Sequence, residues 1–242
     1  MHEPANSSPV VEAADLYRSF GRKQALAGVS FTVRAGECLA LFGPNGAGKT
    51  TVLRTLAGLL RPTRGEARIS GHVLPGEPSV RAHIGIVSHH SLLYDSLSAR
   101  ENVGFAARLY RVPDPDAAAV RALEKMGMGV RMNTPVRSLS RGMQQRVSIA
   151  RAIVHSPSVI LADEPYSGLD DEGSRSLTAL LGELRAAGAA MIVVTHNVAE
   201  GLALATHASV LSAGKIVSLL SRDAIDEAAF PAHYRNLVGT VQ

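Results

Sequence analysis

The segment GPNGAGKT, residues 43–50, constrains the fold of this 242-residue chain more than any other feature. Its glycines let the backbone curl so that successive N–H groups face a bound anion, and a following helix turns its positive end to the same point. Lys49 and Thr50 stand where such loops place a lysine for the β and γ phosphates and a hydroxyl for Mg²⁺. The segment predicts a phosphate-binding loop for ATP or GTP. Its expected nucleotide contacts are Gly43, Pro44, Asn45, Gly46, Ala47, Gly48, Lys49, Thr50 and Thr51.

The residues on either side of the loop predict the strand and the helix that such a loop needs. Residues 37–42 form a nearly continuous apolar run, which is typical of a strand buried on both faces of a parallel sheet. After the loop, apolar residues recur at helical spacing: Val52, Leu53, Leu56, Leu59 and Leu60. This context disfavours the alternative of a glycine-rich surface turn with a chance lysine.

Three further apolar runs, at residues 84–87, 159–162 and 191–195, predict parallel core strands of an α/β fold with a phosphate-loop NTPase core. Residues 88–157 are mainly helical in pattern and too numerous for a single crossover, so they predict an inserted helical subdomain. We expect one domain over residues 10–220. Residues 1–9 are expected to be a disordered tail, and residues 221–242 a C-terminal tail with a short surface helix.

Local signals place two helices in the inserted region. Ser-Ala-Arg-Glu at residues 98–101 is a capping box, and Asp114 precedes Pro115, which is favoured in the first helical turn. The second helix is expected to stop near Gly127 or Gly129.

Composition narrows the classes of protein. The longest apolar runs are far shorter than the ~20 residues that span a bilayer, and the first residues do not resemble a secretion signal. The net charge is +4, but no run of five or six basic residues indicates a nucleic-acid partner. Cys38 is the single cysteine and is expected to be a small core residue, which fits a reducing cytoplasm.

A second group of polar residues follows the apolar run at 159–162. Asp163 and Glu164 stand at its C-terminal end, where open α/β sheets bind ligands. Asp163 suits Mg²⁺, and Glu164 can deprotonate an attacking water. His196 follows another predicted strand and could reach the same edge. Taken alone, the acidic pair could be a solvated turn and the histidine a structural residue.

The segment LSRGMQQR, residues 139–146, lies between these groups. Ser140 can cap a helix whose apolar face is Met143, Val147, Ala150 and Val154. One interpretation is an ordinary amphipathic helix. The other is a second phosphate site, because Ser140, Gly142 and a helix N-terminus together can cradle an anion.

The order of the motifs GPNGAGKTT, LSRGMQQR, ILADEP, SGLD and TH resembles that of ATP-binding subunits of ABC transporters, over roughly residues 10–221. The resemblance implies an ABC ATPase fold with an N-terminal antiparallel β portion. It also implies ATP and Mg²⁺ as cofactors, and hydrolysis coupled to transport. The expected partners are a second cassette and integral membrane subunits, at the cytoplasmic face of the inner membrane.

The same resemblance assigns roles to individual residues. It implies that Ser140 and Gly142 contact the nucleotide of the partner cassette, while Asp170 links the two sites across the dimer. Glu164 is implied as the catalytic base and His196 as the γ-phosphate contact. Phe20 matches the aromatic residue that stacks on adenine; the alternative is a core phenylalanine in an N-terminal strand.

The chain departs from the family pattern in two segments. The common signature is LSGGQ, whereas this chain has Arg141 and Met143. His89 stands where the family usually has a glutamine that contacts Mg²⁺ and the attacking water; a neutral imidazole can still donate or accept, but it titrates near pH ~6.5. A metal site at the pair His89 and His90 is disfavoured, because no further Cys or carboxylate stands at ligand spacing.

The sequence of residues 84–103, together with LSRGMQQR, is most similar to the corresponding segments of haem-exporter ATPases in cytochrome c maturation. Other exporters, of drugs, polysaccharides or lipids, share much of it. Two further alternatives are a soluble ABC ATPase that acts on ribosomes or DNA, and a regulatory subunit with weak hydrolysis. The nucleotide site itself cannot specify a cargo that passes through another polypeptide.

Overall fold

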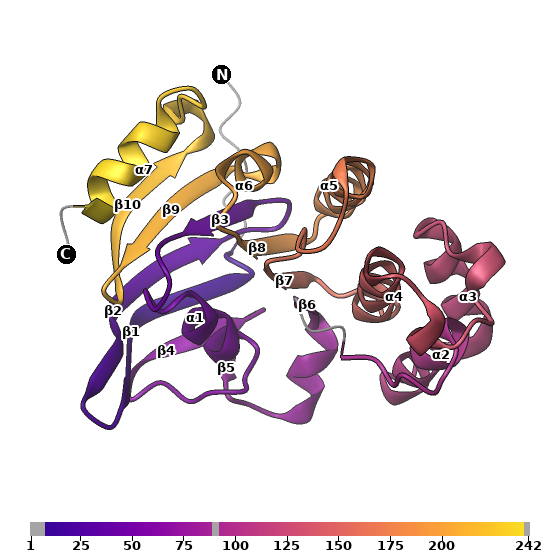
Figure 1. The fold of residues 1–242 in the computed structure, drawn as a ribbon. Helices are drawn as coiled ribbons and strands as arrows, with labels where there is room; N and C mark the ends of the chain where they lie inside the picture. Colours follow the sequence, from indigo (N-terminus) through magenta and orange to yellow (C-terminus); the bar gives the residue numbers. More distant parts are fainter. Residues whose placement is uncertain (1–7, 89–91, 240–242) are drawn as a thin grey trace, which may run out of the picture.

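The computed structural model describes residues 8–88 and 92–239, and its strands form two sheets (Figure 1). Most of the predicted N-terminal tail therefore lies outside the described residues. The smaller sheet is antiparallel and four-stranded, in the order β2-β1-β4-β5. Its strands are β1 Val11–Phe20, β2 Lys23–Val33, β4 Arg64–Ile69 and β5 His72–Leu74. The antiparallel β portion that the resemblance implied is thus confirmed.

The six-stranded sheet has the order β10-β9-β3-β8-β7-β6 and carries the phosphate loop. All neighbouring strands are parallel except the edge strand β10. The bounds are β3 Cys38–Phe42, β6 Ile84–Ser88, β7 Val159–Asp163, β8 Ala190–Val194, β9 His207–Ser212 and β10 Lys215–Ser221. The four predicted parallel strands are confirmed to within one or two residues. The parallel strand β9 was not predicted, because polar residues interrupt its apolar pattern.

Helix α1, Lys49–Leu56, follows the loop and lies between the two sheets (Figure 1). It ends earlier than the apolar spacing predicted. The chain turns at Gly58, where φ is +67°, so Leu59 and Leu60 lie beyond the helix. Leu59 is exposed rather than part of a helical apolar face, which corrects the prediction for this segment.

Helices α2 Ala99–Leu109, α3 Pro115–Lys125 and α4 Arg141–Ile153 lie together at one side of the larger sheet (Figure 1). The predicted capping box begins α2: the Glu101 N–H donates to Ser98 Oγ at 3.2 Å, and the Ser98 N–H donates to Glu101 Oε2 at 2.7 Å. Asp114 caps α3, which ends before Gly127 as predicted. Small buried side chains, mainly alanines, let these helices approach closely.

The remaining helices are α5 Asp171–Ala186, α6 Val198–Leu204 and α7 Phe230–Gly239, with 3-10 turns at Pro78–His83, Gly129–Arg131, Val136–Ser138 and Arg222–Ala224. Helix α7 is more than a surface helix, because it buries Phe230 against Phe42 with ring centroids 5.3 Å apart. Cys38 is fully buried in β3, and burial raises the pKa of its thiol to about 12. No helix within the described ranges is long and apolar enough to cross a membrane.

We expect Ser98→Ala to lower the free energy of unfolding by about 1 kcal/mol, because it removes the acceptor for the orphan N–H of Glu101. For a chain of this size the melting temperature should fall by roughly 2–4 °C. Ser176→Ala, in the middle of α5 and exposed, is the matched control and should leave the melting temperature unchanged or slightly higher. Equal melting temperatures for both variants would contradict a stabilising role for the cap.

Candidate nucleotide-binding site

The loop between β3 and α1 fits tightly against two neighbouring backbone segments. A Cβ at Gly43 would lie 2.2 Å from the Leu211 carbonyl oxygen, and a Cβ at Gly48 would lie 2.4 Å from the Ala25 carbonyl oxygen. No side chain caps the N-terminus of α1, so its first N–H groups are available to an anion. The sequence therefore folds here into a cradle of backbone donors that requires glycine at positions 43 and 48.

Lys49, the first residue of α1, is held over this cradle. Its Nζ donates hydrogen bonds to the Gly43 carbonyl at 2.6 Å and to the Pro44 carbonyl at 3.0 Å. Burial lowers the pKa of the ammonium, whereas Glu164 and Asp163 act in the opposite direction. The positive charge is thus fixed beside the loop and balanced by two carboxylates.

Thr50 and Asp163 bring two oxygens together from different elements. Thr50 Oγ1, in α1, donates to Asp163 Oδ2, at the end of β7, over 3.3 Å. A hydroxyl and a carboxylate are the ligand types that Mg²⁺ prefers, and Mg²⁺ commonly takes few protein ligands beside waters and phosphates. The residues present therefore fit the predicted ion. No cluster of three His, Cys, Asp or Glu side chains suited to a metal occurs among the described residues.

Glu164 and His196 are paired at the same sheet edge. His196 Nδ1 lies 2.9 Å from Glu164 Oε2. The Glu164 backbone is left-handed, with φ of +51°, and its N–H donates to the Val194 carbonyl at 2.8 Å. A non-glycine residue in this conformation is strained, and such strain concentrates at functional sites. Burial raises the pKa of the nearby Glu200 carboxyl; His196 opposes this shift and Glu164 adds to it.

A pocket of about 360 Å³ joins the loop to the acidic pair. Its lining consists of Phe20, Lys23, Ala25, Asn45, Gly46, Gly48, Lys49, Thr50, Thr51, Asp163 and Glu164. Phe20 is 49% exposed, so the alternative of a core phenylalanine is wrong. The Arg18 guanidinium covers the Phe20 ring, 4.8 Å from its centroid. The exposed aromatic face suits stacking on a nucleotide base.

Two residues of the region were missed in the sequence. Lys23 lines the pocket, and its Nζ lies 3.9 Å from the point where a Gly46 Cβ would be. Buried Gln145, in α4, donates from Nε2 to the Pro165 carbonyl at 2.9 Å and so ties α4 to the segment that carries Glu164. Lys23 belongs to no motif, and Gln145 lies within LSRGMQQR at a position to which the sequence assigned no role. Only the fold places them here.

Three other predicted site residues, Ser140, Gly142 and Asp170, do not line this pocket. Ser140 is exposed at the N-terminus of α4, where its Oγ accepts from the Met143 N–H at 3.3 Å, and Gly142 lies in the first turn. Asp170 caps α5 by accepting from the Gly173 N–H at 2.8 Å. His89, predicted as a catalytic and Mg²⁺-contacting residue, lies outside the described residues, as does His90.

A phosphate loop between a parallel strand and a helix, with an acidic pair from β7 at the same edge, defines a phosphate-loop nucleotide-binding protein. The sequence profile of the family described as "ABC transporter" matches residues 26–167, which is more than half of the chain. The chain belongs to the ABC transporter family, as one of its ATP-binding ATPases.

Relatives with different transport roles are similar to this chain. The Nod factor export ATP-binding protein I of Ralstonia nicotianae is 33% identical over 88% of this chain, and the methionine import ATP-binding protein MetN of Mesorhizobium japonicum is 37% identical over 88%. This chain spans 67% and 61% of their respective lengths. A solved dimeric, post-hydrolysis ATP-binding cassette bound to ADP and Pi superposes with a TM-score of 0.80 at 28% identity, covering 88% of this chain and 98% of that one.

We expect Gly43→Ala to reduce ATP affinity at least ~100-fold, because the added Cβ would collide with the Leu211 carbonyl and displace the loop. Gly46→Ala is the matched control: Gly46 also has a positive φ, but its Cβ would meet nothing closer than the Lys23 Nζ. This variant should lose less than ~10-fold, the cost of backbone strain alone. Titration with a fluorescent ATP analogue measures both, and equal losses would show that the close approach is unimportant.

Proposed function

We propose that this chain hydrolyses MgATP as one of two identical cassettes that power transport through separate membrane subunits. The observation that carries the proposal is the 2.9 Å contact between Glu164 and His196, next to Lys49 and the phosphate loop. A carboxylate that is fixed by a strained backbone and an imidazole can accept a proton from an attacking water. Glu164 is therefore proposed as the catalytic base.

His196 and Lys49 are proposed to act on the phosphates. His196 is exposed, and hydrogen bonding to Glu164 leaves its other ring nitrogen to face a γ-phosphate. The Lys49 ammonium would exchange its contacts with loop carbonyls for phosphate oxygens. Mg²⁺, held by Thr50 and Asp163 and by the predicted but undescribed His89, would neutralise negative charge on the β and γ phosphates.

Two copies are proposed to close head to tail over two nucleotides. The exposed Ser140 hydroxyl and the bare backbone at Gly142 lie at the beginning of α4, away from the chain's own pocket. A second chain could therefore use them to contact a γ-phosphate, with Asp170 near the shared surface. The similar cassette that was solved as a dimer with ADP and Pi supports the pairing of two cassettes.

The helices α2–α4 are proposed as the part of the cassette that contacts the membrane subunits. Their region, residues 88–157, would form the inserted subdomain within a single domain of residues 10–220. Peripheral binding at the cytoplasmic face of the inner membrane would follow from this contact. Large apolar side chains are exposed here, including Tyr94, Phe105 and Leu109, which is typical of a protein-binding surface.

Haem export for cytochrome c maturation is the cargo that we propose first, on the similarity of residues 84–103 and of LSRGMQQR to that subgroup. The relatives include an exporter and an importer by name, so the cargo and the direction rest on experiment. Another exporter of drugs, polysaccharides or lipids is the alternative within transport.

We expect Glu164→Gln to bind ATP with unchanged affinity but to lower turnover at least ~100-fold, because the amide cannot accept the proton of the attacking water. The variant should also accumulate as an ATP-bound dimer in size-exclusion chromatography with light scattering. Lys49→Ala provides the contrast, since it should weaken ATP binding itself. Normal turnover of the Gln variant would remove Glu164 from the role of base.

The cargo proposal is tested by purifying tagged Glu164→Gln protein with ATP from detergent-solubilised membranes and identifying co-purified proteins by mass spectrometry. We expect membrane subunits associated with cytochrome c maturation. Other membrane proteins would retain the transport function and reassign the cargo. Recovery with ribosomes or DNA, or with nothing, would contradict the transporter proposal.

A further inference from the structure

Phe20, the aromatic wall of the nucleotide pocket, is covered on one face by a cation. The Arg18 Cζ lies 4.8 Å from the centroid of the Phe20 ring, which is the spacing of a cation–π contact. Phe20 lines the pocket, whereas Arg18 is not among its lining residues. The guanidinium therefore covers the face of the ring that is turned away from the pocket, and the other face stays open to a ligand.

The Arg18 side chain is held in place by the loop that follows α1. Its Nη1 donates a hydrogen bond to the Arg61 carbonyl at 2.9 Å. Its Nε is buried, and no hydrogen-bond partner for it lies among the described residues. Within residues 8–88 and 92–239 no carboxylate forms an ion pair with Arg18. The Arg61 carbonyl and the face of the Phe20 ring are thus the electron-rich groups against which this cation packs.

The loop that holds Arg18 is itself bonded to both halves of the nucleotide site. At its beginning, the Leu60 N–H donates to the Arg54 carbonyl of α1 at 3.2 Å. At its end, the Thr63 N–H donates to the Tyr17 carbonyl of β1 at 2.7 Å. The loop therefore joins the helix that follows the phosphate loop to the strand that carries the aromatic wall.

We propose that Arg18 positions the Phe20 ring, so that its open face is preorganised to stack on the adenine of ATP. This inference rests on the proposed function, because it requires ATP in the pocket. A ring that is clamped on one face loses less conformational freedom when a base binds to the other. Arg18 does not touch the nucleotide, so it is a positioning residue. Its loss should weaken binding of the base and leave the chemistry at Glu164 unchanged.

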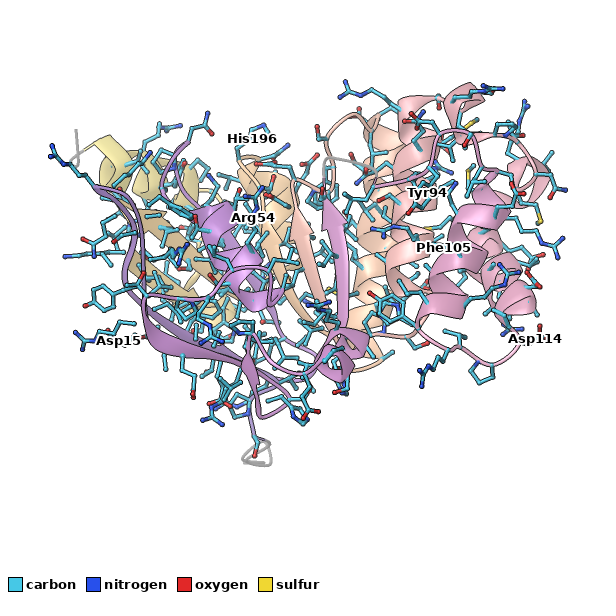
Figure 2. All side chains as sticks on the ribbon, turned by 90° about the horizontal axis from the view of Figure 1, so that it is seen from below. Asp15, Arg54, Tyr94, Phe105, Asp114 and His196 are labelled. Atoms are coloured by element: carbon cyan, nitrogen blue, oxygen red, sulfur yellow. The ribbon has the colours of Figure 1, made fainter. Side chains whose placement is uncertain are left out.

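A second pair of an arginine and an aromatic residue in the same sheet provides an internal comparison. The Arg64 Cζ lies 5.1 Å from the centroid of the Tyr17 ring, and Arg64 also forms an ion pair with Asp15 at 2.9 Å. Neither Arg64 nor Tyr17 lines the nucleotide pocket. Figure 2 shows Asp15 on the antiparallel part of the molecule, apart from His196 at the nucleotide site. Loss of this second contact should therefore not alter ATP binding.

The first test compares Arg18→Met with the matched control Arg64→Met in titrations with ATP and with tripolyphosphate, which has the phosphates but no base. We expect Arg18→Met to weaken ATP binding about 5-fold, the size of an ordinary cation–π contact, and tripolyphosphate binding by no more than ~1.5-fold. Arg18→Lys should restore most of the ATP affinity, and Arg64→Met should bind both ligands like the wild type. In hydrolysis assays Arg18→Met should raise KM for ATP and leave kcat unchanged.

The two ligands separate a failure of this inference from a failure of the proposed function. Wild-type ATP affinity of Arg18→Met would overturn the inference, and so would an equal loss for ATP and tripolyphosphate, which would indicate a general structural role. Both results would leave the proposed function intact. A wild-type chain that bound neither ligand would instead contradict the proposed function itself.

The second test reports on the ring itself and uses the fact that the chain contains no tryptophan. Phe20→Trp introduces a single indole, whose fluorescence anisotropy measures its motion on the nanosecond timescale. We expect saturating ATP to quench this fluorescence, because the base stacks on the indole. Adding Arg18→Met should lower the anisotropy of the nucleotide-free protein, because the ring is released on one face. Equal anisotropy with and without Arg18, or ATP binding without quenching, would overturn the inference.

Discussion

The close approach of the phosphate loop to the end of β9 is the constraint on which the rest of the site depends. The Gly43 backbone lies so near the Leu211 carbonyl that no side chain fits between them. This contact fixes where β3 ends and where α1 begins, and therefore where Lys49 and Thr50 can reach. The parallel register of β7 and β8 then brings Asp163 and Glu164 to the same edge. The Gly43 contact thus sets the position of the cation and the hydroxyl, and the strand register sets that of the carboxylates.

The left-handed backbone at Glu164 directs its side chain toward His196. Its N–H stays paired with the Val194 carbonyl, so β8 holds the strained residue although the strand β7 has already ended. Gln145, in α4, donates to the carbonyl of the following residue, Pro165. Strain of this kind persists only when several neighbours determine the conformation, and here β8 and α4 both do so. The geometry of the proposed catalytic pair therefore depends as much on the sheet and on α4 as on the acidic motif.

Much of the fold and of the loop could be predicted, because the physical signals are local. Strands such as β7 are continuous apolar runs. The capping box can be recognised from the four consecutive residues 98–101. Strand β9 was missed because Ser209 interrupts its apolar pattern although it is fully buried. The exposure of Phe20, and the stacking of Tyr110 on His155, depend on packing between segments far apart in the sequence. No local pattern reports such contacts, so Lys23 and Gln145 were missed as well.

Helix α7 has a consequence for the far side of the phosphate loop. Phe42, the last residue of β3, is enclosed by Phe230 at 5.3 Å and by Tyr234 at 6.4 Å between ring centroids. Helix α7 therefore packs against the end of β3, the strand that precedes the phosphate loop. A bulky fusion after Gly239, or removal of α7, would weaken the packing around the Phe42 ring. The beginning of the phosphate loop, which follows Phe42 directly, would then become more mobile. Helix α7 and the strand that precedes the phosphate loop thus share one hydrophobic cluster.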